Sequence, residues 1–121
     1  MRLAGVDAGR FNLSEKHFQE GLTLAERFSI QERQAGLAAN LGRVAAQRGQ
    51  TSLAIHRLST ALSQADALGA HHLAIQVRLW LAPLLPEDER GVLLREARNM
   101  AESSGRERLL EEVARLEDQT E

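Results

Sequence analysis

Hydrophobic residues recur every three or four positions along most of the chain, which is the spacing that puts them on one face of an α-helix. Six stretches have this rhythm, and short polar or glycine-containing connections separate them. The pattern predicts six helices, at residues 12–28, 31–48, 51–68, 71–84, 87–103 and 106–118. The connections are only two or three residues long, so we expect neighbouring helices to run antiparallel.

The first two helices are expected to pack through apolar stripes. The first stripe consists of Phe18, Leu22, Ala25 and Phe28, and the second of Leu37, Leu41, Val44 and Ala45. The later helices carry similar stripes, and one of them includes Trp80, the only tryptophan. Because Trp80 lies in line with Val77, Leu81 and Leu84, we expect it to pack in the core.

Several helix ends can be predicted from local chemistry. An Asn or Ser stands three residues before a Glu at Asn12, Ser29 and Ser104, which is the pattern of a capping box. Pro86, followed by three acidic residues, is typical of another helix start. Gly49 and Gly69 follow predicted helices, where glycine adopts the left-handed turn without a steric penalty.

Composition supports an all-α domain and excludes several classes of protein. The 121 residues are rich in good helix formers, and β-branched residues are rarely adjacent. The net charge of −2 argues against nucleic-acid binding. No apolar run approaches the length of a membrane helix, and no membrane partner is expected. With no cysteine, disulfides are excluded and a cytoplasmic location is expected. The near-absence of lysine suggests a bacterial source.

Residues for catalysis or metal binding are not arranged in any recognisable pattern. The four histidines are His17, His56, His71 and His72, and no zinc-binding, calcium-binding or phosphate-binding motif is present. Adjacent residues on a helix point about 100° apart, so His71 and His72 do not converge on one ion. We therefore expect that the protein is not an enzyme and that it binds no metal and no cofactor.

A sequence repeat links three parts of the chain. Residues 24–34, 62–72 and 99–109 align on Ala25, Ala65 and Ala101, which are 40 and 36 residues apart. Each block is predicted to end one helix, turn, and begin the next. A period of this length with two helices per unit is typical of an α-solenoid.

The part of this pattern at residues 35–68 resembles the tetratricopeptide repeat (TPR). The residues that carry the resemblance are Ala38, Leu41, Gly42, Ala45, Gly49, Ala54, Leu58 and Ala61. In that family the two helices of each repeat approach closely at small side chains. The resemblance implies that Gly42 and Ala54 lie at this contact, and that Ala61 faces the first helix of the next repeat.

The resemblance also implies a domain organisation. Residues 1–121 would form a single TPR-like domain, similar to the long-period repeats of kinesin light chains and bacterial ATPase regulators. Residues 9–29 would be the second helix of an incomplete repeat and 31–68 the best-matching repeat. Residues 70–104 would be a degenerate repeat and 105–121 a capping helix. An open N-terminal face, with Phe11, Leu13 and Phe18, would then be available for self-association.

TPR proteins bind peptides in a concave groove lined by the first helix of each repeat. The positions next to Leu41-Gly42 and their equivalents in the later helices give the candidate groove residues: Asn40, Arg43, Gln47, His72, Gln76, Leu79, Arg108 and Glu112. Amide and guanidinium groups could hold a peptide backbone or a carboxylate. Chaperone adaptors of the carboxylate-clamp type bind acidic C-terminal tails through a set of basic residues. This set is incomplete here, because Leu79 stands at the position equivalent to Arg43, which argues against an acidic tail as ligand. The alternative is that these are only solvated polar positions.

Two functions follow from this reading. The first is a non-catalytic scaffold that binds a protein or peptide partner in the groove. The second is a self-associating or regulatory C-terminal arm of a larger ATPase-type transcription regulator, with homo-oligomers formed through the open N-terminal face.

Overall fold

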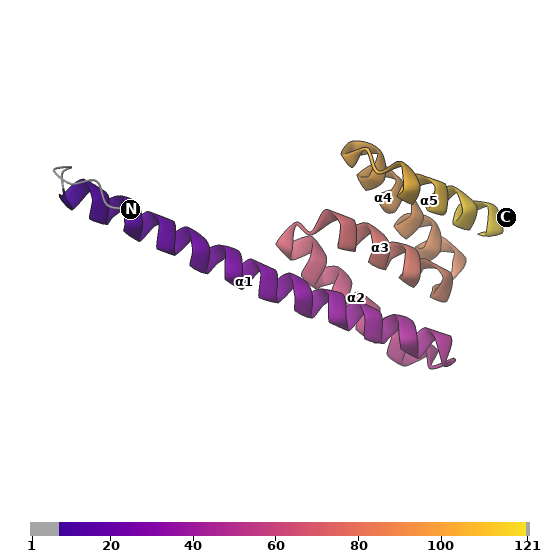
Figure 1. Ribbon diagram of the computed structural model, residues 1–121. Coiled ribbons are helices and arrows are strands. Elements are labelled where there is room, and N and C mark those ends of the chain that lie inside the picture. The colour runs from indigo at the N-terminus through magenta and orange to yellow at the C-terminus, as the bar shows by residue number, and fades with distance from the viewer. Residues whose placement is uncertain (1–7, 121) are drawn as a thin grey trace. The chain divides into compact units, whose positions relative to one another are not determined.

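The computed structural model describes the backbone of residues 8–120 and the side chains of residues 16–119, and every regular element in this part of the chain is a helix. In chain order (Figure 1) the elements are α1 (Ala8–Gln47), α2 (Thr51–Leu68), α3 (His71–Leu81), the 3-10 helix η1 (Ala82–Leu84), α4 (Glu87–Ser104) and α5 (Glu107–Thr120). The predicted all-α class is confirmed.

By their internal contacts the residues divide into two units, Met1–Gln31 and Glu32–Glu121. In the first unit the described backbone is helical. The second unit contains the remainder of α1 and all later helices. The prediction of one domain over residues 1–121 stays a prediction, and each unit is treated by itself.

The first two predicted helices form one helix, α1, so the predicted turn near Ser29 is wrong. The predicted start at Asn12 is also wrong, because α1 begins at Ala8. The repeat aligns Ser29 with Gly69 and Gly105, where the chain turns with φ of 67° and 66°. Serine carries a Cβ that disfavours this left-handed conformation, so the helix continues.

After residue 50 the observed helices follow the predicted ones closely. The helix α4 begins and ends 36 residues after α2, and α5 begins 36 residues after α3. At the end of α2 the Gly69 N–H donates to the carbonyls of Ala65 and Asp66, and Gly105 makes the equivalent bonds at the end of α4. The predicted start at Pro86 is confirmed. Ser104 is not a cap, because it ends α4 and donates to the Met100 carbonyl.

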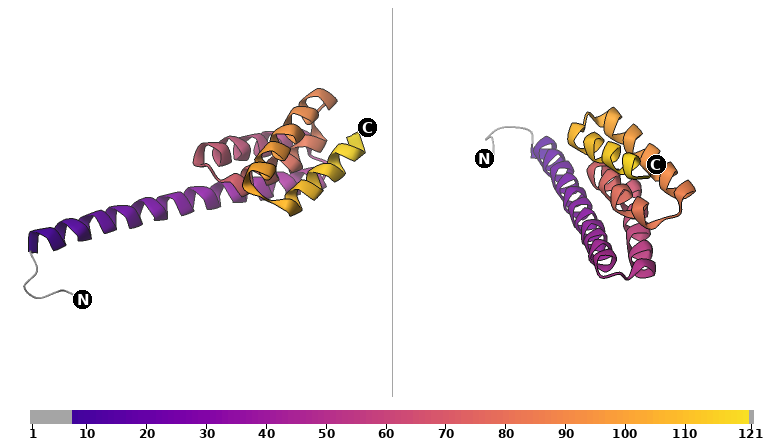
Figure 2. Two further views of the ribbon diagram at one scale, coloured as in Figure 1. Left: turned by 90° about the horizontal axis from the view of Figure 1, so that it is seen from above. Right: turned by 90° about the vertical axis from the view of Figure 1, so that its right-hand side faces the viewer.

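Within the Glu32–Glu121 unit α2 packs against α3, α3 against α4, and α4 against α5, and α3 also contacts α5. Gly42 of α1 lies close to Leu58 of α2. In the right-hand view of Figure 2, α3 lies between α2 and the pair formed by α4 and α5. Three neighbouring apolar clusters form the core. Their largest fully buried side chains are Leu58, Val77, Ile75, Leu79 and Val113.

The predicted close approach at small residues is found between α1 and α2. A Cβ on Gly42 would lie 2.8 Å from Leu58 Cγ and 3.2 Å from the Leu58 backbone nitrogen. Ala54 and Ala61 are fully buried. Glycine at position 42 therefore lets α1 approach the backbone of α2 more closely than any other residue would allow.

The predicted apolar stripe of residues 37–45 is largely wrong, because α1 buries small residues instead. Its buried side chains in this unit are Ala35, Ala39 and Ala45, whereas Leu37, Leu41 and Val44 are exposed. Close packing at Gly42 requires small neighbours on the same face, so the larger residues are turned away from α2.

Candidate peptide-binding groove

A hollow of about 410 Å³ lies on the Glu32–Glu121 unit. Its walls come from the end of α1, the second half of α3 with η1, and α5, which are alternate helices of the chain. The lining residues are Arg43, Ala46, Gln47, Leu79, Trp80, Pro83, Leu84, Glu112 and Leu116. Side chains from these non-consecutive helices therefore meet around one concave surface.

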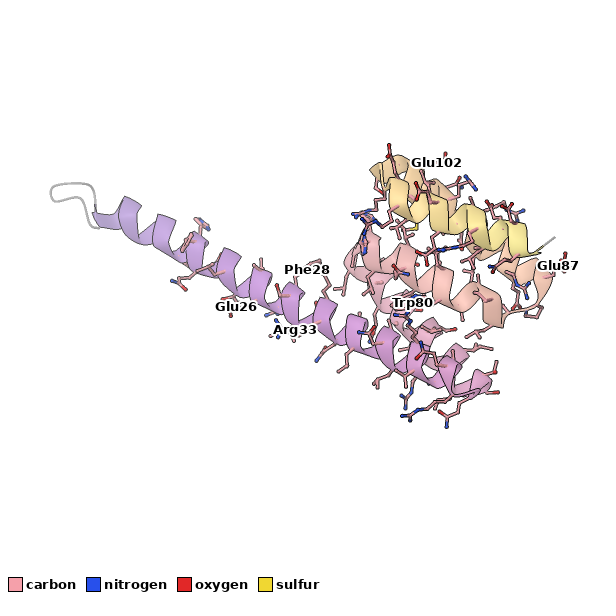
Figure 3. The ribbon with its side chains drawn as sticks, turned by 45° about the vertical axis from the view of Figure 1, so that its right-hand side comes forward. Glu26, Phe28, Arg33, Trp80, Glu87 and Glu102 are labelled. Carbon is pink, nitrogen blue, oxygen red and sulfur yellow. The ribbon has the colours of Figure 1, made fainter. Side chains whose placement is uncertain are left out.

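Trp80 connects this hollow to the core. It is half-buried against the apolar cluster that contains Ala39, Leu58 and Val77, and it also lines the hollow. The guanidinium carbon of Arg43 lies 5.0 Å from the centre of its ring, within cation–π range. Figure 3 shows Trp80 on α3. The predicted core packing of Trp80 is thus confirmed only in part, because the ring also forms part of the hollow.

The hollow combines an apolar floor with opposite charges. Leu79 is almost fully buried and Leu84 is half-buried, while Arg43 and Gln47 are exposed on α1 and Glu112 is half-buried on α5. Such a surface can hold an apolar side chain on Trp80 and bond polar groups on either side of it.

The structure brings together only some of the predicted groove residues. Arg43, Gln47, Leu79 and Glu112 line the hollow described above. Arg108 lies instead with Glu111, Glu112 and Arg115 around a second hollow of about 410 Å³ on α5.

The other three predicted groove residues do not line the Trp80 hollow. Asn40 is exposed and Gln76 is half-buried. His72 is exposed at the start of α3, where its Nδ1 lies 3.2 Å from Arg106 Nη1. Their predicted role in a groove therefore has less support than that of Arg43, Gln47, Leu79 and Glu112.

Sequence analysis missed the apolar half of the hollow, namely Trp80, Pro83, Leu84 and Leu116. Trp80 was assigned to the core because helical periodicity reports that a residue is apolar, not whether part of its ring remains accessible. A usable signal was present, since Leu79 replaces the arginine of the preceding repeat and the next residue is the only tryptophan.

A buried arginine holds α3 in place beneath the hollow. Arg78 is only 7% exposed. Its Nη1 and Nη2 donate to the two carboxylate oxygens of Asp66 on α2, each at 2.9 Å, and its Nε lies 3.5 Å from Glu96 on α4. Nη1 also donates to the Ala74 carbonyl at 3.2 Å.

Burial of Arg78 by itself lowers its pKa, but the hydrogen bonds that it donates to Asp66 and the charges of Asp66 and Glu96 outweigh burial and raise the pKa. Arg78 is therefore a permanent cation that joins α2, α3 and α4. Because Leu79 and Trp80 follow it directly, this network fixes the rotation of α3 that presents them to the hollow.

Neither a metal-binding cluster nor a membrane-spanning helix is found among the described residues. No group of three or more His, Asp or Glu side chains there is placed to hold a metal ion. No helix among them has the length and apolar character needed to cross a membrane.

Comparisons with models of protein families, with curated proteins and with solved structures found no match to this chain.

Proposed function

We propose that the Glu32–Glu121 unit is a TPR-like stack of helix pairs that binds a peptide segment or helix of a partner protein in the hollow around Trp80. One observation carries the proposal. The hollow is lined by the end of α1, by α3 with η1 and by α5, which are the segments that the TPR resemblance identifies as the first helix of each repeat.

Three features support a stacked arrangement. The second helices α2 and α4 begin 36 residues apart, and so do the first helices α3 and α5. From α2 onward each helix packs on the next, and α3 also touches α5, so these two first helices are neighbours across one repeat. Gly42 lies at a close contact with Leu58 of α2, and Ala54 is fully buried, and both observations are compatible with the TPR resemblance.

The chemistry of the hollow favours a non-catalytic role and a particular kind of ligand. An indole ring with Leu79 and Leu84 suits one bulky apolar side chain, and Arg43 and Glu112 suit polar or charged groups that flank it. Because both charges are present, a ligand of mixed charge fits better than a purely acidic tail.

Selection from a displayed library of random peptides, followed by titration of the recovered peptides, tests the proposal. Trp80→Ala should weaken binding about thirtyfold, because a buried aromatic contact contributes about 2 kcal/mol. Arg43→Ala should weaken it by roughly fivefold. His56→Ala, an exposed change on α2, is the matched control and should leave affinity unchanged.

Asn40→Ala separates this hollow from the wider groove expected from sequence. Asn40 is exposed on α1 but does not line the hollow, so its loss should leave binding intact. If Trp80→Ala binds the selected peptides as well as the unchanged chain does, the hollow is not the binding site.

One observation favours the second function, a self-associating arm of a larger regulator. Large apolar side chains are exposed along α1, among them Phe18, Leu24 and Leu37. Such residues are typical of a surface that another protein covers.

A further inference from the structure

Two apolar stripes on α1 are exposed to solvent. In the Met1–Gln31 unit Phe18 is 65% and Leu22 43% exposed, and in the other unit Leu37 is 60% and Leu41 44% exposed. Isolated exposed apolar residues are ordinary, but repeated ones at helical spacing mark a contact surface.

The first stripe corresponds to residues that are covered in α2. The alignment of Ala25 with Ala65 places Phe18 at the position of Leu58 and Leu22 at the position of Leu62. Leu58 is fully buried and Leu62 packs partly against the same apolar cluster. Residues 16–28 therefore have the side chains of a helix that packs like α2 and lack the cover that α2 has.

The second stripe corresponds to the face of α3 that α2 covers. An offset of 36 residues places Leu37 at the position of Leu73 and Leu41 at the position of Val77, and both α3 residues belong to the cluster of Leu58 and Leu62. An antiparallel pairing of Leu58 with Val77 and of Leu62 with Leu73 is compatible with their shared cluster. Transferred to α1, this pairing sets Phe18 opposite Leu41, and Leu22 opposite Leu37.

Charged residues fit this same antiparallel register. With Phe18 opposite Leu41, Glu26 is opposite Arg33, and Arg27 is opposite Glu32. The stretch 26–33, ERFSIQER, is therefore complementary to a second copy of itself. An interface with two-fold symmetry requires this kind of self-complementarity.

We propose that two copies of this chain exchange their α1 helices, with residues 16–28 of each packed antiparallel on Leu37 and Leu41 of the other. The two stripes lie on one uninterrupted helix, Ala8–Gln47, and a helix does not pack against itself. A second copy provides the same contacts that a turn at Ser29 would provide within one chain, as in domain swapping.

The exchange is independent of the proposed peptide groove. It uses Leu37 and Leu41, whereas the hollow uses Arg43, Ala46 and Gln47 of the same helix. If the chain binds no peptide, the proposed exchange still stands. If the chain is monomeric, the proposed peptide-binding hollow still stands.

Disulfide trapping tests the proposal, because the natural chain has no cysteine. The double variant Leu22→Cys/Leu37→Cys, oxidised and run without reductant, should give a covalent dimer of twice 13.4 kDa. Peptide mapping should find position 22 joined to position 37. Both residues are exposed, so the substitutions leave the core intact, which circular dichroism checks.

The other results of this experiment overturn the proposal. A covalent monomer would mean that each chain folds back on itself, and a ladder of larger species or no cross-link would exclude a closed exchange. Leu24→Cys/Leu37→Cys is the matched control, since Leu24 is also exposed but lies about 200° around the helix from Leu22. It should give no discrete dimer.

Charge reversal gives a second test without cross-linking. By light scattering over a dilution series, Glu26→Arg should raise the dimer dissociation constant about tenfold, because each symmetric dimer would contain two repelling pairs with Arg33. Figure 3 labels Glu26 and Arg33 on α1. Glu26→Arg/Arg33→Glu should restore the dimer. A natural chain that stays monomeric at every concentration overturns the exchange.

Discussion

At the scale of single residues, Gly42 shows how packing can outweigh helix propensity. Gly42→Ala adds a Cβ 2.8 Å from a Leu58 side-chain carbon and 3.2 Å from the Leu58 backbone nitrogen, which cannot move away easily. We expect the free energy of unfolding to fall by about 1–3 kcal/mol, despite a gain of about 1 kcal/mol in helix propensity. Urea denaturation measures the difference.

Gly36→Ala is the matched control for this prediction. Gly36 lies on the same helix, and a Cβ there would meet nothing within 4 Å. The substitution should therefore stabilise the chain by up to about 1 kcal/mol. Equal effects of the two alanines would show that the close approach at Gly42 does not matter.

The ion pair between Arg78 and Asp66 carries a second prediction. Asp66→Asn removes the carboxylate that accepts two hydrogen bonds from a buried guanidinium, so the free energy of unfolding should fall by about 1–2 kcal/mol. Glu102→Gln is the control. It removes an exposed partner 3.8 Å from Arg98 and should cost less than about 0.5 kcal/mol. Thermal unfolding of both variants compares the two costs.

The residues differ in how far sequence alone could predict them. The contact at Gly42 was predictable, because a glycine inside a helix at this spacing from Ala54 and Ala61 needs a packing reason. The role of Arg78 was not, because arginine is usually exposed and its partners lie 12 and 18 positions away in sequence. The residues that line the hollow were predictable only in part, because Arg43 was expected there and Trp80 was expected in the core.

At the scale of elements, helix ends were predictable where glycine decides them. Gly69 and Gly105 turn the chain with positive φ, and α2 ends at Leu68 as expected. Ser29 and Ser104 misled the prediction, because a capping-box pattern describes a helix start only if the preceding helix has ended. No residue near Ser29 ends the helix, so it continues. After Ser104 the helix ends, but Gly105 ends it.

Two glycines, one inside α4 and one directly after it, test this account of helix ends. Gly105→Ala forces a Cβ into the left-handed conformation at φ 66°, so it should cost about 1 kcal/mol. Gly91→Ala, inside the same helix and with open space around its Cβ, should stabilise by up to about 1 kcal/mol. Chemical denaturation compares them, and a neutral Gly105→Ala would contradict the account.

At the scale of the whole molecule, the proposed exchange depends on one local property, the absence of a turn at Ser29. The same apolar and charged pairs can form within a chain or between two chains, so the pairs themselves do not choose the oligomeric state. The oligomeric state depends on the backbone between the two stripes. A turn there would bring the packing segment from the same chain, whereas a continuous helix requires it from a second copy.

A turn built into α1 should therefore convert the dimer to a monomer without a change in its packed surfaces. In Ser29→Gly/Ile30→Pro, the glycine reproduces the turn at Gly69, and the proline stops the helix at a cost of about 3 kcal/mol to its continuation. Light scattering should then give 13.4 kDa, the mass of one chain. When Leu22→Cys and Leu37→Cys are added, the disulfide should form within the chain. A variant that still forms the covalent dimer would mean that the contacts between copies, and not the missing turn, determine assembly.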